Sequence, residues 1–327
     1  MAIIIGNLKP EDDGMHELGP EPNFNESMYF NFFDPGRALG GFVRLGNRAN
    51  EGRAEMTVCL FLPDAKVLFA FKRAEIAGND AFDAGGLRFE VIEPTERLRT
   101  VYSGGVIELD NPRSLSDPGT AFRESPRRRI ALDLTHEAVG PMYGESHDRA
   151  ESGRDAGKQF AKAHYEQHMR VTGTVDIGEG DSHTLIEIDG FGLRDHSWGP
   201  RYWQAIEQYE WLTMNFGADL GVMVSRVQVA GAPVREGGVI IRGDRLEPIK
   251  SVEIEADYED NGLYHRSLIA RIETREGERH SIEGAVQGFI PLRNRREGMT
   301  THIGEGMTRW QFGNRTGYGL SEFLRQV

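Results

Sequence analysis

The chain has 327 residues, and its 51 acidic and 38 basic side chains give a formal net charge of −13. This negative surplus repels nucleic acid and anionic membrane surfaces, so we expect neither as a partner. The single cysteine, Cys59, excludes an internal disulfide and a cysteine metal cluster, and no apolar run approaches the roughly 20 residues of a membrane span. We therefore expect a cytoplasmic protein that is long enough for two domains.

The first informative segment is FNESMYFNFFDP, at residues 24–35. Alternation along a strand directs one set of its side chains to a shared face: Glu26, Met28, Phe30 and Phe32. If that face lines an apolar cavity, burial raises the pKa of Glu26 and keeps its carboxyl protonated at neutral pH. Alternatively, Glu26 lies at the mouth of the strand and hydrogen-bonds the backbone of a loop.

Short strand-like segments, separated by Gly, Pro, Asn and Asp, recur on both sides of a polar middle region. That region, at about residues 110–167, is typical of loops, and we expect one helical turn or more towards its end. Long helical periodicity is almost absent, which favours an all-β sandwich or a pair of β-barrels. We place the domain boundary near residue 165, with a first barrel at 1–165 and a second at 166–327.

Two histidines, His164 and His168, stand four positions apart in HYEQH. On a helix this spacing puts both imidazoles on one face and resembles half of a zinc site. However, no third ligand is evident and the following MRVTGTV is strand-like, so we expect no metal. Six other histidines lie in polar or turn-like contexts and are expected at the surface: His16, His136, His147, His183, His265 and His280.

The densest group of chemically active side chains is GFGLRDHSWGPR, at residues 190–201. We expect GFG to form a tight turn after the strand HTLIEIDG, which places the polar residues at a strand end. If the segment is extended, Arg194, His196 and Trp198 share one face and Asp195 lies on the other. A bulge or turn at the glycines would instead bring Asp195 and His196 together.

The C-terminal run MTTHIGEGMTRWQFGNRTGYGLSEF predicts a β-hairpin with its turn at GNRTG. It carries two carboxylates and several rings: His302, Glu305, Trp310, Tyr318 and Glu322. Two interpretations remain open. The segment is an ordinary closing hairpin, or it contributes to a cavity wall.

The signature GFGLRDHSWGPR, with Trp203 and Trp211 downstream, resembles that of the AttH and hydroxyneurosporene synthase superfamily. NESMYFNFFDP, EQHMRVTGTV and GYGLSEF extend the likeness over most of the chain. This lipocalin-like group includes carotenoid hydratases and, more distantly, tocopherol cyclases. The resemblance implies two consecutive lipocalin-like or calycin-like antiparallel barrels with a cavity for a hydrophobic small molecule. It also implies addition of water to an isoprenoid double bond, or its cyclisation, by proton transfer without a redox cofactor.

That chemistry needs a positioned acid and aromatic faces that stabilise a carbocation. We expect Asp195 to donate the proton, or to orient His196 if the imidazole carries it. Because a neighbouring arginine lowers a carboxyl pKa, Glu26 and Glu305 stay as alternative acids. The residues expected to bind substrate are Arg194, Trp198, Arg201, Trp203, Tyr209, Trp211, Tyr29 and His302. No cofactor and no metal are expected.

Three functions remain open at this stage. The first is a lyase or isomerase, of the hydratase, dehydratase or cyclase type, that acts on a terpenoid- or steroid-like molecule. The second is a lipocalin-like carrier of a hydrophobic ligand. The third is a structural or assembly protein, in which the signature forms a corner held by a buried ion pair. A homodimer is compatible with all three.

Overall fold

The computed structural model describes residues 3–146, 163–179, 182–296 and 298–326. Its contacts divide the chain into two compact units. The first unit comprises residues 1–62, 68–108 and 125–202, and the second comprises residues 63–67, 109–124 and 203–327.

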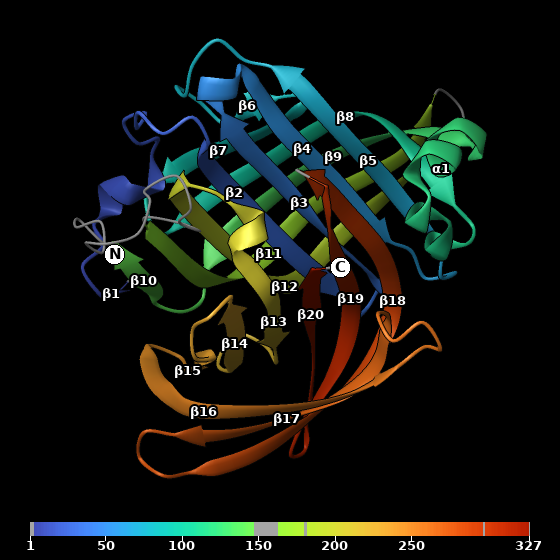
Figure 1. Cartoon of the computed structure of the whole chain (residues 1–327). Coiled ribbons are helices and arrows are strands. Elements are labelled where there is room, and N and C mark those ends of the chain that lie inside the picture. The colour runs from blue at the N-terminus through green and yellow to red at the C-terminus, as the bar shows by residue number, and fades with distance from the viewer. Residues whose placement is uncertain (1–2, 147–162, 180–181, 297, 327) are drawn as a thin grey trace. The chain divides into compact units, whose positions relative to one another are not determined.

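The first unit is built mainly of strands (Figure 1). Its elements are β1 (Ile4–Ile5), η1 (Pro10–Asp13), β2 (Phe24–Asp34), β3 (Leu39–Arg48), η2 (Ala49–Glu51), β4 (Arg53–Phe61), β5 (Val67–Glu75), β6 (Asp83–Ala84), β7 (Leu87–Glu93), β8 (Arg97–Leu109), β9 (Arg127–Ala138), β10 (Met142–Ser146), β11 (Ala163–Glu179) and β12 (Ser182–Pro200). Strand β9 pairs with both β8 and β11, so the ladder closes into a ring in the order β11, β12, β2, β3, β4, β5, β8, β9.

The second unit contains a closed barrel in which each strand pairs with its neighbours in sequence. Its elements are η3 (Pro112–Ser116), α1 (Pro118–Glu124), η5 (Trp203–Ala205), β13 (Ile206–Asn215), β14 (Gly221–Val229), β15 (Arg235–Arg242), β16 (Arg245–Tyr258), β17 (His265–Thr274), β18 (Arg279–Arg296), β19 (Met299–Phe312) and β20 (Arg315–Gln326). All of the barrel pairings are antiparallel, and β20 closes the barrel on β13. The expected all-β fold with two barrels and a short helical insertion is thus confirmed.

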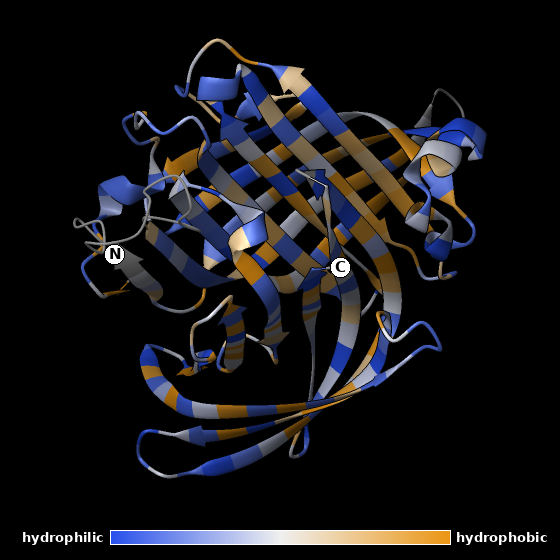
Figure 2. Cartoon of the chain, in the orientation of Figure 1, coloured by the Kyte–Doolittle hydropathy of each residue, from blue (hydrophilic) through white to orange (hydrophobic). Residues whose placement is uncertain are grey.

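Strand alternation determines which side chains form the hydrophobic core of each unit. Met28, Phe30 and Phe32 of β2 lie in the first core cluster, as their spacing predicts. In the second unit, Leu212 of β13 and Trp310 of β19 lie in a separate cluster. Figure 2 shows the same alternation as bands of hydrophilic and hydrophobic residues along β16 and β17.

Three expectations about local structure were wrong or need redrawing. Residues 190–192 form no turn, because β12 runs without interruption to Pro200. Residues 163–168 form the start of β11 and not a helical turn, since they pair with both β10 and β12. The rest of the segment expected to hold a helical turn, residues 147–162, lies outside the described residues. Among the described residues, a short helical insertion of η3 and α1 lies between β8 and β9. The expected boundary at residue 165 falls inside β11, whereas the two units divide at 202 and 203.

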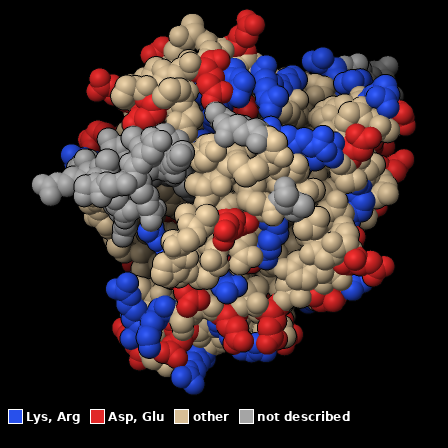
Figure 3. All heavy atoms as spheres, viewed as in Figure 1, with Lys and Arg blue, Asp and Glu red and all other residues tan. Residues whose placement is uncertain are grey.

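Charge on the surface is mixed. Acidic and basic side chains are interspersed on the face drawn in Figure 3. Within the described residues, no helix is long and apolar enough to cross a membrane.

Candidate active site

The geometry of β12 determines which residues of the signature, residues 190–201, share a face. Each of its residues from Phe191 to Trp198 pairs in register with β11 or β2, with no bulge. The segment is therefore extended. Arg194 and His196 are fully buried and Trp198 is nearly so, all on the interior face of the first unit, while Asp195 lies on the opposite face.

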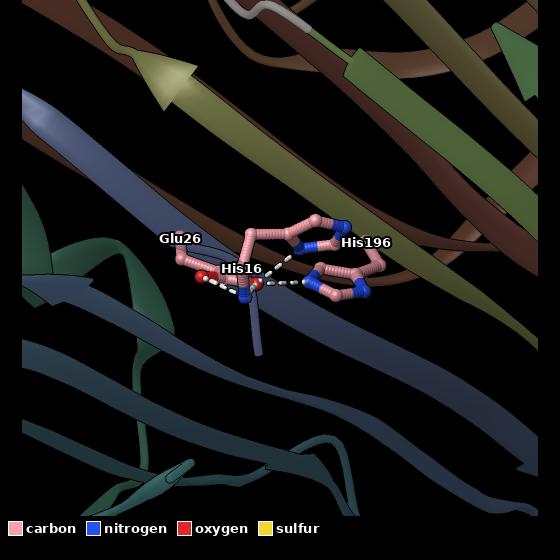
Figure 4. A group of neighbouring side chains, drawn as sticks. All are labelled: His16, Glu26 and His196. Carbon is pink, nitrogen blue, oxygen red and sulfur yellow. Dashed lines mark hydrogen bonds and ion pairs between the residues drawn. The ribbon is translucent and has the colours of Figure 1, made fainter. Parts of the chain in front are cut away.

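Glu26 of β2 stands directly opposite Trp198 of β12. Its carboxylate is fully buried and accepts hydrogen bonds from two imidazoles, as Figure 4 shows. His16 Nδ1 lies 2.7 Å and His196 Nε2 lies 3.1 Å from Glu26 Oε1. The side-chain amide of Asn79 donates to Oε2. One buried carboxylate thus joins two histidines that are far apart in the sequence.

Of the two interpretations of Glu26, the protonated acid is wrong. The other, a carboxylate that accepts a hydrogen bond from a loop backbone, agrees with the structure, because the backbone N–H of His16 donates to it. Burial raises the pKa of Glu26, but hydrogen bonds from His16 and His196 outweigh it and lower the pKa to about 2. Strand alternation correctly predicts that this carboxylate is buried beside Met28 and Phe30. It does not reveal the donors, because one of them comes from a segment outside the strands. Glu26 is therefore an ionised hydrogen-bond acceptor at neutral pH.

His16 is the residue that sequence reasoning missed. It was expected at the surface, yet its ring stacks on the Trp198 indole at a centroid distance of 3.7 Å and an interplanar angle of 11°. Its backbone N–H also donates to both carboxylate oxygens of Glu26, at 3.0 and 3.1 Å. The side chain keeps 19 % exposure, so it is the reachable member of a group whose other two members are fully buried.

A second buried network places the segment that carries His16. Asp13, at the end of η1, accepts hydrogen bonds from the guanidinium of Arg194, the hydroxyl of Tyr165 and the backbone N–H of Thr95. Although burial raises the pKa of Asp13, the positive charge of Arg194 and these hydrogen bonds lower it overall. Gln167 accepts from Arg194 Nε at 2.9 Å. Asp13 therefore anchors the N-terminal segment to the interior of the first unit.

The two networks meet at Tyr165. Its hydroxyl oxygen lies 3.1 Å from His196 Nδ1 and accepts a hydrogen bond from Arg194 at 3.0 Å. Around His196, the rings of Phe82 and Tyr165 stand edge-on at 5.5 and 5.3 Å between centroids. The His16–Glu26–His196 group is thus bordered by aromatic rings.

Asp195 has different partners on the outer face of the same strands. It forms an ion pair with His164, whose Nε2 also lies 3.4 Å from Glu166 Oε1. Burial raises the pKa of Asp195, but the charge and hydrogen bond of His164 lower it overall. Tyr143 donates to the other oxygen of Glu166 at 2.9 Å. Asp195 is therefore an ionised carboxylate that faces away from the His16–Glu26–His196 group.

Among the described residues, two groups of side chains have the atoms to hold a metal ion. They are His16, Glu26 and His196 on the inner face, and His164, Glu166 and Asp195 on the outer face. His168 belongs to neither, because four residues along a strand separate it from His164 by about 13 Å. The helical half-site considered for these two histidines therefore does not form.

Glu305 belongs to the second unit, on β19. It is 4 % exposed, and burial raises its pKa to about 8. Its Oε2 has no hydrogen-bond partner within the part of the chain that the structure describes. Glu322 stands directly opposite on β20. Glu305 is therefore a protonated acid at neutral pH, as the sequence hypothesis required of one candidate.

The remaining expected substrate-binding residues are spread over both units. In the first unit, Tyr29 packs against Phe42 on the outer face, and Arg201 donates to the Ser197 hydroxyl at 2.6 Å. The second unit holds the others: Trp203 in η5, Tyr209 and Trp211 on β13, and His302 on β19. Burial and the charges of two arginines lower the pKa of His302.

Other histidines depart from the surface expectation. His136 and His265 are fully buried inside the first and second unit respectively. His183 is exposed as expected and pairs with Asp176. His280 is partly buried. His147 lies outside the described residues.

The structure is thus a protein of two β-barrel units with a buried His–Glu–His group in the first. Residues 9–327 match the family model described as "Domain of unknown function (DUF7064)", and the chain belongs to that family. No curated protein matches it.

Among solved structures, an AttH from Nitrosomonas europaea aligns with a TM-score of 0.64 and 15 % identity over 99 % of this chain and 98 % of its own. CghA with Sch210972 aligns at 0.57 and 10 % identity over 96 % and 94 %. Kievitone hydratase from Nectria haematococca aligns at 0.57 and 11 % identity over 91 % and 88 %. The resemblance drawn from the sequence is thus confirmed at the level of the fold.

Proposed function

We propose that the protein is a cofactor-independent lyase or isomerase, of the hydratase, dehydratase or cyclase type. Its substrate is a hydrophobic, terpenoid- or steroid-like small molecule. Proton transfer takes place at the His16–Glu26–His196 group in the first unit. The observation that carries this proposal is the single buried carboxylate shared by two imidazoles, one of them reachable.

Glu26 acts here as an orienting group. Because it is ionised, it accepts the Nδ1–H of His16, as the carboxylate does in a serine-protease triad. The other ring nitrogen, Nε2, lies 3.5 Å from Asp12 Oδ1 and is the atom that exchanges a proton with the substrate. His196 and Asn79 hold Glu26 in place. The indole of Trp198 stacks on the His16 ring and fixes its orientation.

In the hydration direction, protonated His16 donates its Nε2 proton to one carbon of the double bond. Water adds to the other carbon, and the proton that this water loses returns to His16. Dehydration is the reverse. In a cyclisation, a double bond of the same molecule attacks the carbocation in place of water. The new carbocation then loses a proton from an adjacent carbon to His16. An imidazolium is a weaker acid than a carboxylic acid, so this group suits an alkene activated by conjugation or by an electron-donating substituent.

Two further points support the proposal. One structural neighbour is named as a hydratase, which agrees with the reaction class. Asp195 was the expected proton donor, but its carboxylate is ionised and faces the other side of β12. We therefore assign Asp195 to the His164 ion pair and His16 to proton transfer.

The test is a screen of terpenoid and steroid alkenes and alcohols by mass spectrometry. It looks for a mass change of one water, or for an unchanged mass with a new retention time. For a substrate found in this way, we expect His16→Gln and Glu26→Gln to lower kcat at least about 100-fold. Asp195→Asn is the matched control, and we expect it to retain turnover.

Equal turnover by His16→Gln and the wild type would contradict the assignment of the proton-transfer group. Ligand binding without turnover across the screen would instead favour the carrier function.

A further inference from the structure

His136, on β9, is a buried imidazole that the proposed reaction does not use. Its side chain is fully buried, and its Nε2 lies 2.8 Å from the Thr100 hydroxyl oxygen. Its Nδ1 is also buried and has no hydrogen-bond partner among the described residues. Half of this ring's hydrogen-bonding capacity is therefore unused.

An unpaired polar atom in a protein interior calls for an explanation. Leaving one buried and unsatisfied destabilises the fold, and native proteins pair nearly all such atoms. Burial lowers the pKa of His136 to about 3, so the ring is neutral and gains nothing from a charge partner. A phenylalanine would fit among the same neighbours without this penalty. The imidazole thus points to a partner that is not part of the chain.

Aromatic rings connect His136 to the proposed reaction group. The Phe30 ring lies 4.1 Å from His136 and 5.1 Å from Phe89, between centroids. Phe89 lies 6.1 Å from Phe82, and Phe82 lies 5.5 Å from His196. A series of contacting phenylalanine rings in the core of the first unit therefore leads from His136 to His196.

We propose that His136 is the polar anchor of the ligand site, where its Nδ1 hydrogen-bonds a hydroxyl or carbonyl oxygen at the end of the ligand remote from the reacting carbon. The ligand is then an apolar molecule with an oxygen at one end, and not a pure hydrocarbon. This inference rests on the proposed function for the identity of ligand and substrate. The binding it predicts is measurable without turnover.

The experiment compares a C15 terpenoid alcohol with the hydrocarbon of the same skeleton, by titration of tryptophan fluorescence. We expect the wild type to bind the alcohol about 5- to 100-fold more tightly, as one buried hydrogen bond provides. The variant Thr100→Val/His136→Phe replaces both polar partners by apolar ones. We expect it to stay folded, to keep its affinity for the hydrocarbon and to lose the preference for the alcohol.

The chain supplies a matched control in the second unit. His265 is likewise fully buried, its Nε2 lies 2.7 Å from the Ser321 hydroxyl oxygen, and its Nδ1 has no partner among the described residues. We expect Ser321→Ala/His265→Phe to leave the preference for the alcohol unchanged.

Three results would overturn the proposal. The wild type shows no preference, the preference survives Thr100→Val/His136→Phe, or the control variant is the one that removes it. A crystal structure of the alcohol complex with only a water at His136 Nδ1 would overturn it as well. A screen without turnover, together with an intact preference that depends on His136, would count against the proposed function alone.

Discussion

At the scale of single residues, the environment of Glu26 decides what this carboxylate can do. A charge inside an apolar barrel is unfavourable unless donors surround it. Here His16, His196 and Asn79 supply those donors. The same environment lowers the pKa of Glu26 and so removes it as a proton source at neutral pH.

Replacing the Glu26 carboxylate measures how much its hydrogen bonds contribute to the free energy of unfolding. Glu26→Gln places an amide N–H against donors that need an acceptor, so we expect a loss of about 3 kcal/mol in the free energy of unfolding. Urea denaturation measures it. The control is Glu93→Gln, at an exposed pair with Arg97, which should change stability by less than about 0.5 kcal/mol. Equal effects of the two substitutions would refute the buried-acceptor role of Glu26.

Two members of the reaction group could be predicted from the sequence and one could not. Glu26 and His196 follow from strand alternation, because each sits among residues whose spacing marks a buried face. His16 lies in DDGMHELG, where no period exists. Its place depends on Asp13 binding Arg194, which is 181 positions away in the sequence. Only a tertiary contact reveals it.

At the scale of elements, β12 has glycines where its backbone lies closest to β2. Glycines in GFG were expected to turn the chain, but their function is close approach to β2. A Cβ at Gly192 would lie 1.8 Å from the Asn31 carbonyl oxygen, and one at Gly190 would lie 2.2 Å from that of Phe33. A turn and a crowded strand crossing require the same residue type, so the sequence alone does not distinguish them.

This crowding is testable. We expect Gly192→Ala to destabilise the protein by about 3 kcal/mol, because backbone must move to admit the methyl group. Gly105→Ala on β8 is the control, since its added Cβ would come no closer than 3.9 Å to its nearest neighbour. Thermal unfolding compares the two. A Gly192→Ala protein as stable as the control would show that β2 and β12 can separate freely.

On β19, the pKa of Glu305 is shifted in the opposite direction to the pKa of Glu26. Burial without a donor raises its pKa to about 8. A carboxyl with a raised folded-state pKa stabilises the fold below its unfolded-state pKa, and this contribution is lost as pH rises towards 8. Glu305→Gln keeps the shape without the charge, so we expect it to gain on the order of 4 kcal/mol relative to wild type at pH 9 and little at pH 5. Urea denaturation at both pH values checks this, and a gain of equal size at both would contradict it.

At the scale of the whole molecule, repeated short strands and sparse helical periodicity were enough to predict two barrels. The boundary between the units was not predictable in the same way. The sequence of residues 163–200 predicts the start of a second run of strands. In the structure, however, β11 pairs with β9 and β12 pairs with β2, so both strands close the first ring. Which barrel a strand joins depends on its partners, and hydrophobic alternation carries no information about them.

The buried titratable groups together predict the dependence of stability on pH. Burial lowers the pKa of His136 to about 3 and of His265 to about 4, so both contributions are lost as pH falls below 6.5. The low pKa of Glu26 adds a further loss between pH 4.5 and 2. Because burial raises the pKa of Glu305 to about 8, the stability of the fold decreases as pH rises towards that value.

We therefore expect maximal stability near pH 6.5. Thermal unfolding between pH 4 and 9 measures the profile. A steady rise of melting temperature up to pH 9 would show that these groups do not titrate as their surroundings dictate.

The pairing of β2 with β12 also constrains how the protein is made. Asn31 on β2 stands opposite Leu193 on β12, so the first ring cannot close until the ribosome has released well over half of the chain. Until then β2 is paired only with β3, and its other edge has no partner strand. Pairing between strands far apart in the sequence is slow, and an unpaired strand edge is prone to aggregation. Synthesis therefore leaves one edge of β2 without its partner strand until residues 191–200 have emerged.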